Sequence, residues 1–500
     1  MISLKELLEN HENENIEFKE SFIKLSKDFW PTYSAFANTA GGYIVLGIAE
    51  PVPYQYEVSG VKNHKKLLDD LFNTAANKDK VNHNQLNKNN IEIFEDDGKV
   101  VISIYIAELP VNQKPLYLNK NISNTYIRKN TGDYLATEEE IRRFMRNASD
   151  NIDGELLDGY TIEDLDIESI LAFKNIVHLR KPEGRYLAMD NSEFLKSMGL
   201  FRIDRNDGRK WKLTLAGLLF LGTEEAILSR IPHFHLDYLN KRGNNARWSD
   251  RVSSGDLNYQ NLNIFKFYSI VLNKLFLTIR EPFELDKKAI RKSSAELEII
   301  IREALVNMLV HADYLDSETA IRAEVHDFFY TFTNPGTMKI PQEQFFVGGH
   351  SEPRNNTLIT FFKKMGASEK EGGGGREIFT ITQNNRFRIP ELDVTLKSTF
   401  LKIWLAAPED SYPDFSEKTR TVFLYIKENY SVKMKEIEKN TKISYHFVRK
   451  ALQELLDLDL IEMTGKGKAT KYTWKPSKIE RFAAVESIKK CNNEKLILCF

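Results

Sequence analysis

The sequence of 500 residues lacks several features that would place it in a specialised class of protein. Its two cysteines, Cys491 and Cys499, both lie at the extreme C-terminal end, which excludes a disulfide framework or a cysteine-rich zinc site. No stretch reaches the roughly 18 apolar residues of a transmembrane helix, and the N-terminus lacks the apolar core of a signal peptide. We therefore expect a soluble, cytoplasmic protein with no membrane partner.

An excess of charge is also absent, because 70 basic residues stand against 71 acidic ones. Any affinity for nucleic acid must then come from local basic patches. A chain of this length exceeds one compact core, so we expect three or four domains. The overall prediction is an α+β multidomain fold with a C-terminal tail, divided into residues 1–147, 155–285, 286–405, 414–475 and 476–500.

Three motifs between residues 302 and 376 follow one another in the order that an ATP pocket needs. Glu303 and Asn307 are four residues apart on a helical pattern, so they share one face. Such a pair can hold Mg²⁺ together with nucleotide phosphates, and Glu303 can orient an attacking water. The motifs are Arg302-Glu303-Ala304-Leu305-Val306-Asn307, Phe332-Thr333-Asn334-Pro335-Gly336 and Glu371-Gly372-Gly373-Gly374-Gly375-Arg376.

The glycine run from Gly372 to Gly375 precedes a helical pattern. Without side chains, its backbone amides can approach phosphates closely, and the following helix N-terminus favours an anion. Taken singly, a Glu/Asn pair is usually a solvated helix face, and a glycine run is usually a flexible linker. The order of the motifs favours the nucleotide site.

Residues 295–405 resemble the divergent GHKL-type ATPase domain of bacterial regulators that also carry a Schlafen-type AlbA domain. The resemblance implies an α/β sandwich that binds ATP with Mg²⁺ on Asn307 and with Glu303 as candidate base. Typical members read adenine with an aspartate followed by a glycine, whereas this chain has Asn334-Pro335. We therefore expect binding rather than fast hydrolysis. The cofactor-binding residues implied are Asn307, His311, Asn334, Gly336, Gly372, Gly373, Gly374 and Gly375.

Residues 1–147 predict a small α+β domain. A strand-like alternation at Ile16-Glu17-Phe18-Lys19 is followed by a helix that ends at a glycine turn, Gly41-Gly42, and by a buried strand from Tyr43 to Ile48. This segment resembles the Schlafen-type AlbA domain, which in animal ribonucleases carries a carboxylate triad on divalent metal, Mg²⁺ or Mn²⁺.

By motif position, Glu12 and Glu17 match the first two carboxylates, both as metal ligands, and Glu50 is the candidate for the third. The chemistry would be attack of a metal-activated water on a phosphodiester. Alternatively, Glu17 and Lys19 pair on one strand face and Glu12 is solvated. Lys19, Arg128 and Lys129 are candidate phosphate contacts, although scattered bases are often only solubilising.

Residues 155–285 are predicted to form a connector or scaffold. His233 and His235 alternate in a strand-like pattern, but no third ligand stands at metal spacing, so local hydrogen bonding is the favoured interpretation. An apolar run from Leu213 to Gly222 is expected to be buried.

Residues 414–475 predict three helices, Glu417 to Glu428, Met434 to Lys439 and Tyr445 to Leu456, followed by a hairpin. That order is typical of a winged helix-turn-helix, which also occurs as a protein docking module. The third helix would read the major groove, and the basic wing would contact phosphates. The predicted nucleic-acid contacts are Ser444, Tyr445, Arg449, Lys466 and Lys468.

Three functions remain open from the sequence. The leading hypothesis is an ATP-binding, DNA-binding transcriptional regulator, with DNA or RNA as partner and a homodimer or higher homo-oligomer as its form. The enzyme-class alternative is a metal-dependent endoribonuclease that cleaves tRNA or other RNA in antiviral defence. The third is a docking scaffold with a vestigial ATP site.

Overall fold

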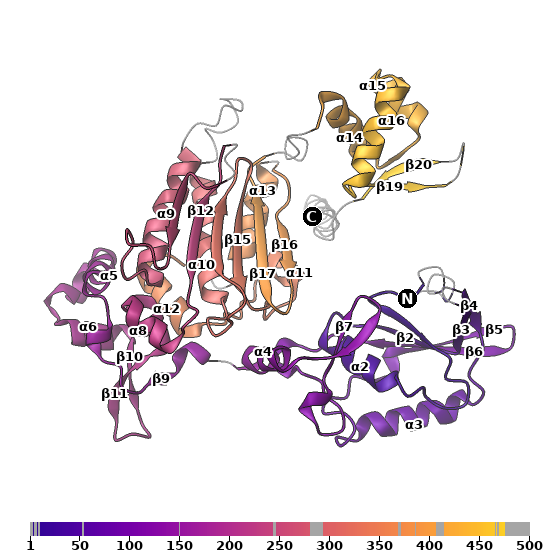
Figure 1. Ribbon diagram of the computed structural model, residues 1–500, viewed down its shortest axis with the longest axis horizontal. Helices are drawn as coiled ribbons and strands as arrows, with labels where there is room; N and C mark the ends of the chain where they lie inside the picture. The colour runs from indigo at the N-terminus through magenta and orange to yellow at the C-terminus, as the bar shows by residue number, and fades with distance from the viewer. Residues whose placement is uncertain are drawn as a thin grey trace, which may run out of the picture. The chain divides into compact units, whose positions relative to one another are not determined.

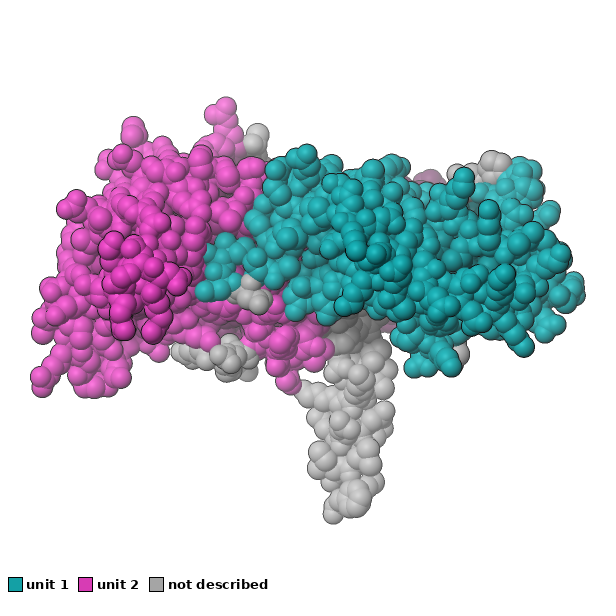
Figure 2. Space-filling model, turned by 90° about the horizontal axis from the view of Figure 1, so that it is seen from below, with its two compact units in different colours: residues 1–152 teal, residues 153–500 magenta. Residues whose placement is uncertain are grey.

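The computed structural model describes residues 4, 8, 11–52, 55–149, 151–243, 247–280, 294–368, 372–385, 387–406, 415–465, 467 and 470–475 (Figure 1). The chain divides into two compact units, Met1–Ile152 and Asp153–Phe500, which Figure 2 colours separately. Among the described residues, no helix is both long and apolar enough to cross a membrane.

The N-terminal unit contains a four-stranded sheet in the order β1-β2-β6-β5. β1 runs parallel to β2, and the other neighbours are antiparallel. Two short hairpins, β3–β4 and β7–β8, stand beside this sheet. The strands are β1 (Ile16–Lys19), β2 (Gly42–Leu46), β3 (Ile48–Val52), β4 (Gln55–Val58), β5 (Ile91–Asp96), β6 (Lys99–Ile106), β7 (Tyr126–Lys129) and β8 (Gly132–Leu135).

The α-helices among the described residues of this unit include α2 (Phe29–Asn38), α3 (His64–Ala76) and α4 (Glu138–Ala148). The buried faces of α2 and α3 share one core with β2 and β6. Asn38 ends α2 inside this core, where its amide donates to the carbonyls of Leu116 and Tyr126 and its Oδ1 accepts from the Leu116 amide. Asn38 therefore fastens the end of α2 to the segment from Leu116 to β7.

The second unit begins with a helical region that carries a three-stranded sheet in the order β10-β11-β9. Every residue of α7 (Leu215–Leu221) is buried, as the apolar run predicts. The other elements are β9 (Leu156–Leu157), α5 (Ile167–Arg180), α6 (Asn191–Met198), β10 (Phe201–Asp204), β11 (Lys210–Thr214), α8 (Glu224–Arg230) and α9 (Ile264–Arg280).

A six-stranded mixed sheet in the order β13-β12-β14-β15-β17-β16 forms the centre of this unit (Figure 1). β12 pairs parallel with β14 although about 80 residues separate them, so the sheet draws strands from residues 236 to 404. The strands are β12 (Leu236–Asn240), β13 (Asp250–Ser253), β14 (Ile321–Val325), β15 (Phe329–Pro335), β16 (Glu391–Val394) and β17 (Ser398–Trp404).

Helix α10 (Ser294–His311) packs on β14 and β15, with α9 and α13 as its neighbours. Alternation along β14 buries Ile321, Ala323 and Val325, while Arg322 and Glu324 take the opposite face. The remaining helices here are α11 (Gln342–Val347), α12 (Asn356–Met365) and α13 (Gly374–Asn384).

Residues 415–475 form three helices and a three-stranded antiparallel sheet, with the predicted hairpin as two of its strands. The three predicted helices are confirmed to within one or two residues at their ends. Their apolar faces share one core that includes Phe423, Leu452 and Tyr472. The elements are α14 (Glu417–Asn429), β18 (Ser431–Val432), α15 (Met434–Thr441), α16 (Tyr445–Asp457), β19 (Ile461–Thr464) and β20 (Lys471–Trp474).

Candidate functional site: a polar cavity along helix α10

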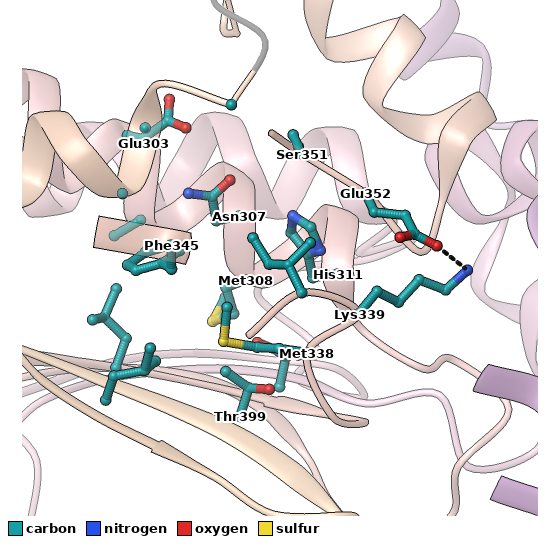
Figure 3. A pocket seen from close by; sticks show the side chains of 18 of the residues that line it. Glu303, Asn307, Met308, His311, Met338, Lys339, Phe345, Ser351, Glu352 and Thr399 are labelled. Atoms are coloured by element: carbon teal, nitrogen blue, oxygen red, sulfur yellow. Dashed lines mark ion pairs between the residues drawn. The ribbon is translucent and has the colours of Figure 1, made fainter. Parts of the chain in front are cut away.

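One face of α10 lines a cavity with three polar side chains (Figure 3). Glu303, Asn307 and His311 follow one another at four-residue spacing, which places them in a row along the helix. The same cavity is lined by Asn334 of β15 and by three glycines, Gly372, Gly374 and Gly375. The three sequence motifs therefore meet around one space.

Glu303 stands at the end of this row next to the start of α13. Burial raises the pKa of its carboxyl, a hydrogen bond with the Asn307 amide opposes this rise, and the nearby charge of Glu377 adds to it. Gly374 approaches the carboxylate so closely that an added Cβ would lie 1.8 Å from Glu303 Oε1. Only glycine at this position leaves the carboxylate where it is.

His311 lies at the other end of the row. Burial, together with the positive charges of Arg354 and Lys339, lowers its pKa to about 4. The imidazole is therefore neutral at physiological pH and offers the cavity one donor and one acceptor.

The opposite wall of the cavity comes from β15, β17 and the segment after β15. Asn334 is 5 % exposed and donates from Nδ2 to the backbone oxygen of Pro335 at 3.2 Å. Gly336 has φ +91, a left-handed conformation that only glycine adopts without strain, and an added Cβ would meet the Arg354 guanidinium at 2.9 Å. Gly336 shapes this wall without lining the cavity itself.

The glycine run is split between a turn and a helix. Gly372 has φ +66, and its carbonyl accepts from the Gly349 amide at 2.8 Å. Gly373 is the N-cap of α13, which begins at Gly374. The positive end of the helix dipole and its first free amides are thus at the cavity, an arrangement that favours an anion.

These residues fit a nucleotide with its magnesium ion. The Asn307 amide is held by the Glu303 carboxylate, which accepts from its nitrogen and leaves its oxygen as a ligand. One amide oxygen together with phosphate oxygens and water is an ordinary Mg²⁺ environment. Glu303 and Asn307 would hold the metal end, and the start of α13 the phosphates.

Sequence reasoning missed several residues that line the cavity. Lys339 and Glu352, which form an ion pair at 3.9 Å, line one side of it, and Met338, Phe345 and Thr399 also contribute to the walls (Figure 3). Lys339 follows the Asn-Pro-Gly motif by three positions, which is a signal that could have found it. The others carry no local pattern.

The N-terminal carboxylates Glu17 and Glu50 both lie close enough to Glu12 to affect its ionisation. Burial raises the pKa of Glu12, and the charges of Glu17 and Glu50 raise it further, against a hydrogen bond from the Phe18 amide. That amide donates to Glu12 Oε1 at 2.8 Å. Glu50 is exposed on β3.

Both oxygens of Glu17 are engaged by bases. Lys19 Nζ lies 2.6 Å from Oε1, and Arg128 Nη2 lies 2.7 Å from Oε2. The Arg128 side chain, 2 % exposed, also pairs with Asp133 at 2.9 Å and donates to the Asn13 carbonyl. The Glu17–Lys19 pair of the predicted alternative is present, but the expectation that Glu12 is solvated is wrong, because Glu12 is half-buried and accepts from the Phe18 amide.

This arrangement does not fit a divalent metal, because the Glu17 oxygens already face two cations. Nor do the described ranges contain any group of three or more His, Cys, Asp or Glu side chains that could hold a metal ion. His233 and His235 precede β12 and belong to no such group. The metal role of Glu12 and Glu17 stays a prediction, and Arg128 is buried rather than presented to a phosphate.

In the C-terminal three-helix region, Ser444, Tyr445 and Arg449 are exposed on or next to the first turns of α16, and Lys129 is exposed at the end of β7. Lys466 and Lys468 lie outside the described residues.

Comparison with known proteins identifies two segments. Residues 12–137 match the family described as Schlafen, AlbA_2, and residues 142–237 match a domain of unknown function, DUF8451. The chain is therefore an α+β multidomain protein whose N-terminal unit contains a Schlafen AlbA_2 domain.

Two solved structures are similar to this chain. The crystal structure of the DIP2311 protein from Corynebacterium diphtheriae shares 12 % identity over 92 % of this chain and 95 % of that one, with a TM-score of 0.37. The N-terminal domain of a putative ATP-dependent DNA helicase RecG-related protein from Nitrosomonas europaea shares 25 % identity over 27 % and 95 %, with a TM-score of 0.22. Both TM-scores are too low to support a statement about the fold. No curated protein matches the chain.

Proposed function

We propose that this chain binds ATP with Mg²⁺ in the cavity along α10, binds nucleic acid, and acts as a DNA-binding transcriptional regulator. The observation that carries the proposal is the convergence of Glu303, Asn307 and His311 with Asn334 and the glycine run around one cavity. We further propose that residues 286–405 form a GHKL-like domain and residues 414–475 a winged helix-turn-helix.

Each side of the cavity has a role in this proposal. The first amides of α13 donate to the phosphates, and Asn307 offers its oxygen to Mg²⁺, which screens the phosphate charge. Glu303 orients water at the same end. Asn334, whose nitrogen is held by the Pro335 carbonyl, presents its oxygen as an acceptor for an exocyclic amino group, which adenine has.

The nucleic-acid contacts are assigned to α16 and to the AlbA_2 domain. Tyr445 and Arg449 are exposed at the start of α16, where a reader helix contacts base edges, and the wing lysines follow the phosphates. ATP changes DNA binding only through a difference in affinity for two conformations of the chain. A homodimer would present two such helices to two half-sites.

Titration calorimetry with ATP and Mg²⁺, beside duplex-DNA binding with and without ATP, tests this function. Asn307→Ala should weaken nucleotide binding at least tenfold, whereas Asn206→Ala, at an exposed turn, should not. Arg449→Ala should weaken duplex binding, with the exposed Arg209→Ala as its control. If the wild-type protein binds neither ATP nor duplex DNA, the docking-scaffold hypothesis replaces the regulator.

A second candidate is a metal-dependent endoribonuclease in antiviral defence. It is favoured by the raised pKa of Glu12, which burial and the nearby charges of Glu17 and Glu50 cause, and it is opposed by the ion pairs of Glu17. Incubation with total tRNA and Mn²⁺ or Mg²⁺ separates the two functions. RNA fragments that depend on metal and vanish in Glu17→Ala would replace the regulator by the nuclease.

A further inference from the structure

Asp153 is a buried carboxylate at the start of the second unit. It is 1 % exposed and directly follows Ile152, where the first unit ends. Its Oδ2 accepts from the backbone amides of Thr357 at 2.9 Å and Leu358 at 2.7 Å, which are 204 and 205 positions away. Asp153 therefore caps the N-terminus of α12, and the helix dipole there favours its negative charge.

The N-cap residue of α12, Asn355, does not cap its own helix. Its side-chain amide instead donates to the carbonyls of Val310 at 3.0 Å and Ala312 at 2.8 Å. Val310 lies in the last turn of α10 and Ala312 directly follows the helix, whose last carbonyls have no partner within it. Because Asp153 satisfies the start of α12, Asn355 remains available to hold α10.

Arg354 strengthens the same connection. Its Nε donates to the His311 carbonyl at 3.1 Å and its Nη2 to the Thr337 carbonyl at 2.7 Å. Arg354 thus ties the end of α10 to the wall that follows β15. A continuous set of hydrogen bonds leads from Asp153, through the start of α12, to the helix that presents Asn307 and His311 to the cavity.

Asp153 lies close in sequence to the boundary between the two units. Helix α4 of the first unit ends at Ala148, only five positions before Asp153. A carboxylate so close to the junction would sit in solvent if it served only as part of a linker. Its Oδ1 is buried without a hydrogen-bond partner, a cost that a purely solvated linker residue does not carry.

We propose that Asp153 is a positioning residue that couples the junction of the two units to the nucleotide cavity. The proposal rests on nucleotide binding at that cavity. Movement of the junction that withdraws Asp153 frees the first amides of α12, releases the Asn355 bonds to α10, and shifts Asn307 and His311. By reciprocity, a nucleotide that fixes α10 also fixes Asp153.

Hydrogen exchange of the full chain, followed by mass spectrometry with and without MgATP, provides the test. In the wild type, nucleotide should slow exchange in the peptide spanning residues 149–158, which contributes nothing to the cavity lining. Asp153→Ala should speed exchange at residues 305–312 even without nucleotide, and should weaken MgATP binding roughly 5- to 10-fold, as couplings between sites commonly do.

Two further variants separate the coupling from general damage. Asp153→Asn keeps an acceptor for the two amides and should restore most of the affinity. Asp190→Ala removes a comparable cap, since Asp190 accepts from the Glu193 amide at 2.8 Å at the start of α6, and should leave exchange at 305–312 unchanged.

The outcomes are distinct. An unchanged 149–158 peptide in a wild type that binds MgATP overturns the coupling, and this measurement needs no variant to fold. Equal exchange at 305–312 in Asp153→Ala and wild type also overturns it. A wild type without nucleotide affinity overturns the proposed function and the coupling together, and exchange at 305–312 still decides whether Asp153 holds the end of α10.

Discussion

Glu17 in the N-terminal unit and Glu303 in the cavity region are both carboxylates of sequence motifs, but their side chains have different contacts. Both oxygens of Glu17 face bases, Lys19 and Arg128, within 2.7 Å. Glu303 lines a cavity, burial raises its pKa, and it hydrogen-bonds with an amide. A charge compensated on every side is a structural element, whereas a carboxyl with a perturbed pKa at a cavity is suited to chemistry or ligand binding.

Among the variants that test this contrast, a substitution of Arg128 should cause the largest loss of stability. Arg128→Met leaves Glu17 and Asp133 without their shared cation, and removing one partner of a buried ion pair costs about 3–5 kcal/mol. Urea unfolding of the full chain, with limited proteolysis as the readout for the N-terminal unit, should show this loss of stability.

Lys129→Met is the matched control, because Lys129 is the next residue on β7 but its side chain is 54 % exposed in its pair with Glu140. Exposed pairs contribute about 0–1 kcal/mol. If Arg128→Met and Lys129→Met lose equal free energy of unfolding, the buried ion pairs of Glu17 stabilise the unit no more than an exposed pair does.

The pH dependence of stability that His311 causes tests the cavity region. Its pKa of about 4 in the folded chain lies below the ordinary 6.5, so the unfolded chain binds more protons between these values. Stability therefore rises with pH from 4 to 6.5 and is lost as pH falls through this window, by roughly 3 kcal/mol at most.

His311→Gln should flatten that part of the stability curve, measured by urea unfolding at several pH values. His233→Gln, at an exposed position before β12, should leave the slope as it is. A slope that persists in His311→Gln would assign the pH dependence to other groups.

The sequence predicts the part of the cavity lining that lies in local motifs. Four-residue spacing places Glu303, Asn307 and His311 in a row, and a glycine run before a helical pattern predicts the turn that begins α13. The same local logic predicts the three helices of residues 417–457. What lies within one helix or one turn is readable from periodicity.

Long-range partners could not be predicted in this way. Glu17 and Arg128 are 111 positions apart, and Asp153 caps a helix 204 positions later. No local sequence pattern indicates which distant residue pairs with Glu17 or Asp153. From the sequence alone, Arg128 is therefore predicted to contact phosphate. Likewise β12 joins β14 across a predicted domain boundary, because backbone pairing between distant strands leaves no periodic signal.

Gly374→Ala is a smaller perturbation that moves one carboxylate. The added Cβ would lie 1.8 Å from Glu303 Oε1, 2.4 Å from its Cδ and 2.6 Å from its Cγ, so the Glu303 side chain must move beyond its carboxylate end. Alanine favours the helix by up to about 1 kcal/mol, which offsets part of the cost of that movement, so unfolding should change little. MgATP affinity should fall about tenfold as Asn307 loses its partner, and calorimetry with unchanged affinity would separate Glu303 from nucleotide binding.

Glu303→Gln should have the smallest effect on stability. Because the pKa of Glu303 is raised in the folded chain, its ionised form is disfavoured there, and stability declines as pH rises through the ordinary 4.5 towards the raised pKa. A glutamine side chain has nearly the same shape and no charge, so the variant should be at least as stable as the wild type at pH 7. Any ATP hydrolysis should disappear, whereas the corresponding Glu17→Gln should lose stability by weakening two ion pairs. If Glu303→Gln destabilises the chain as much as Glu17→Gln does, both carboxylates are structural and the contrast between the two regions is lost.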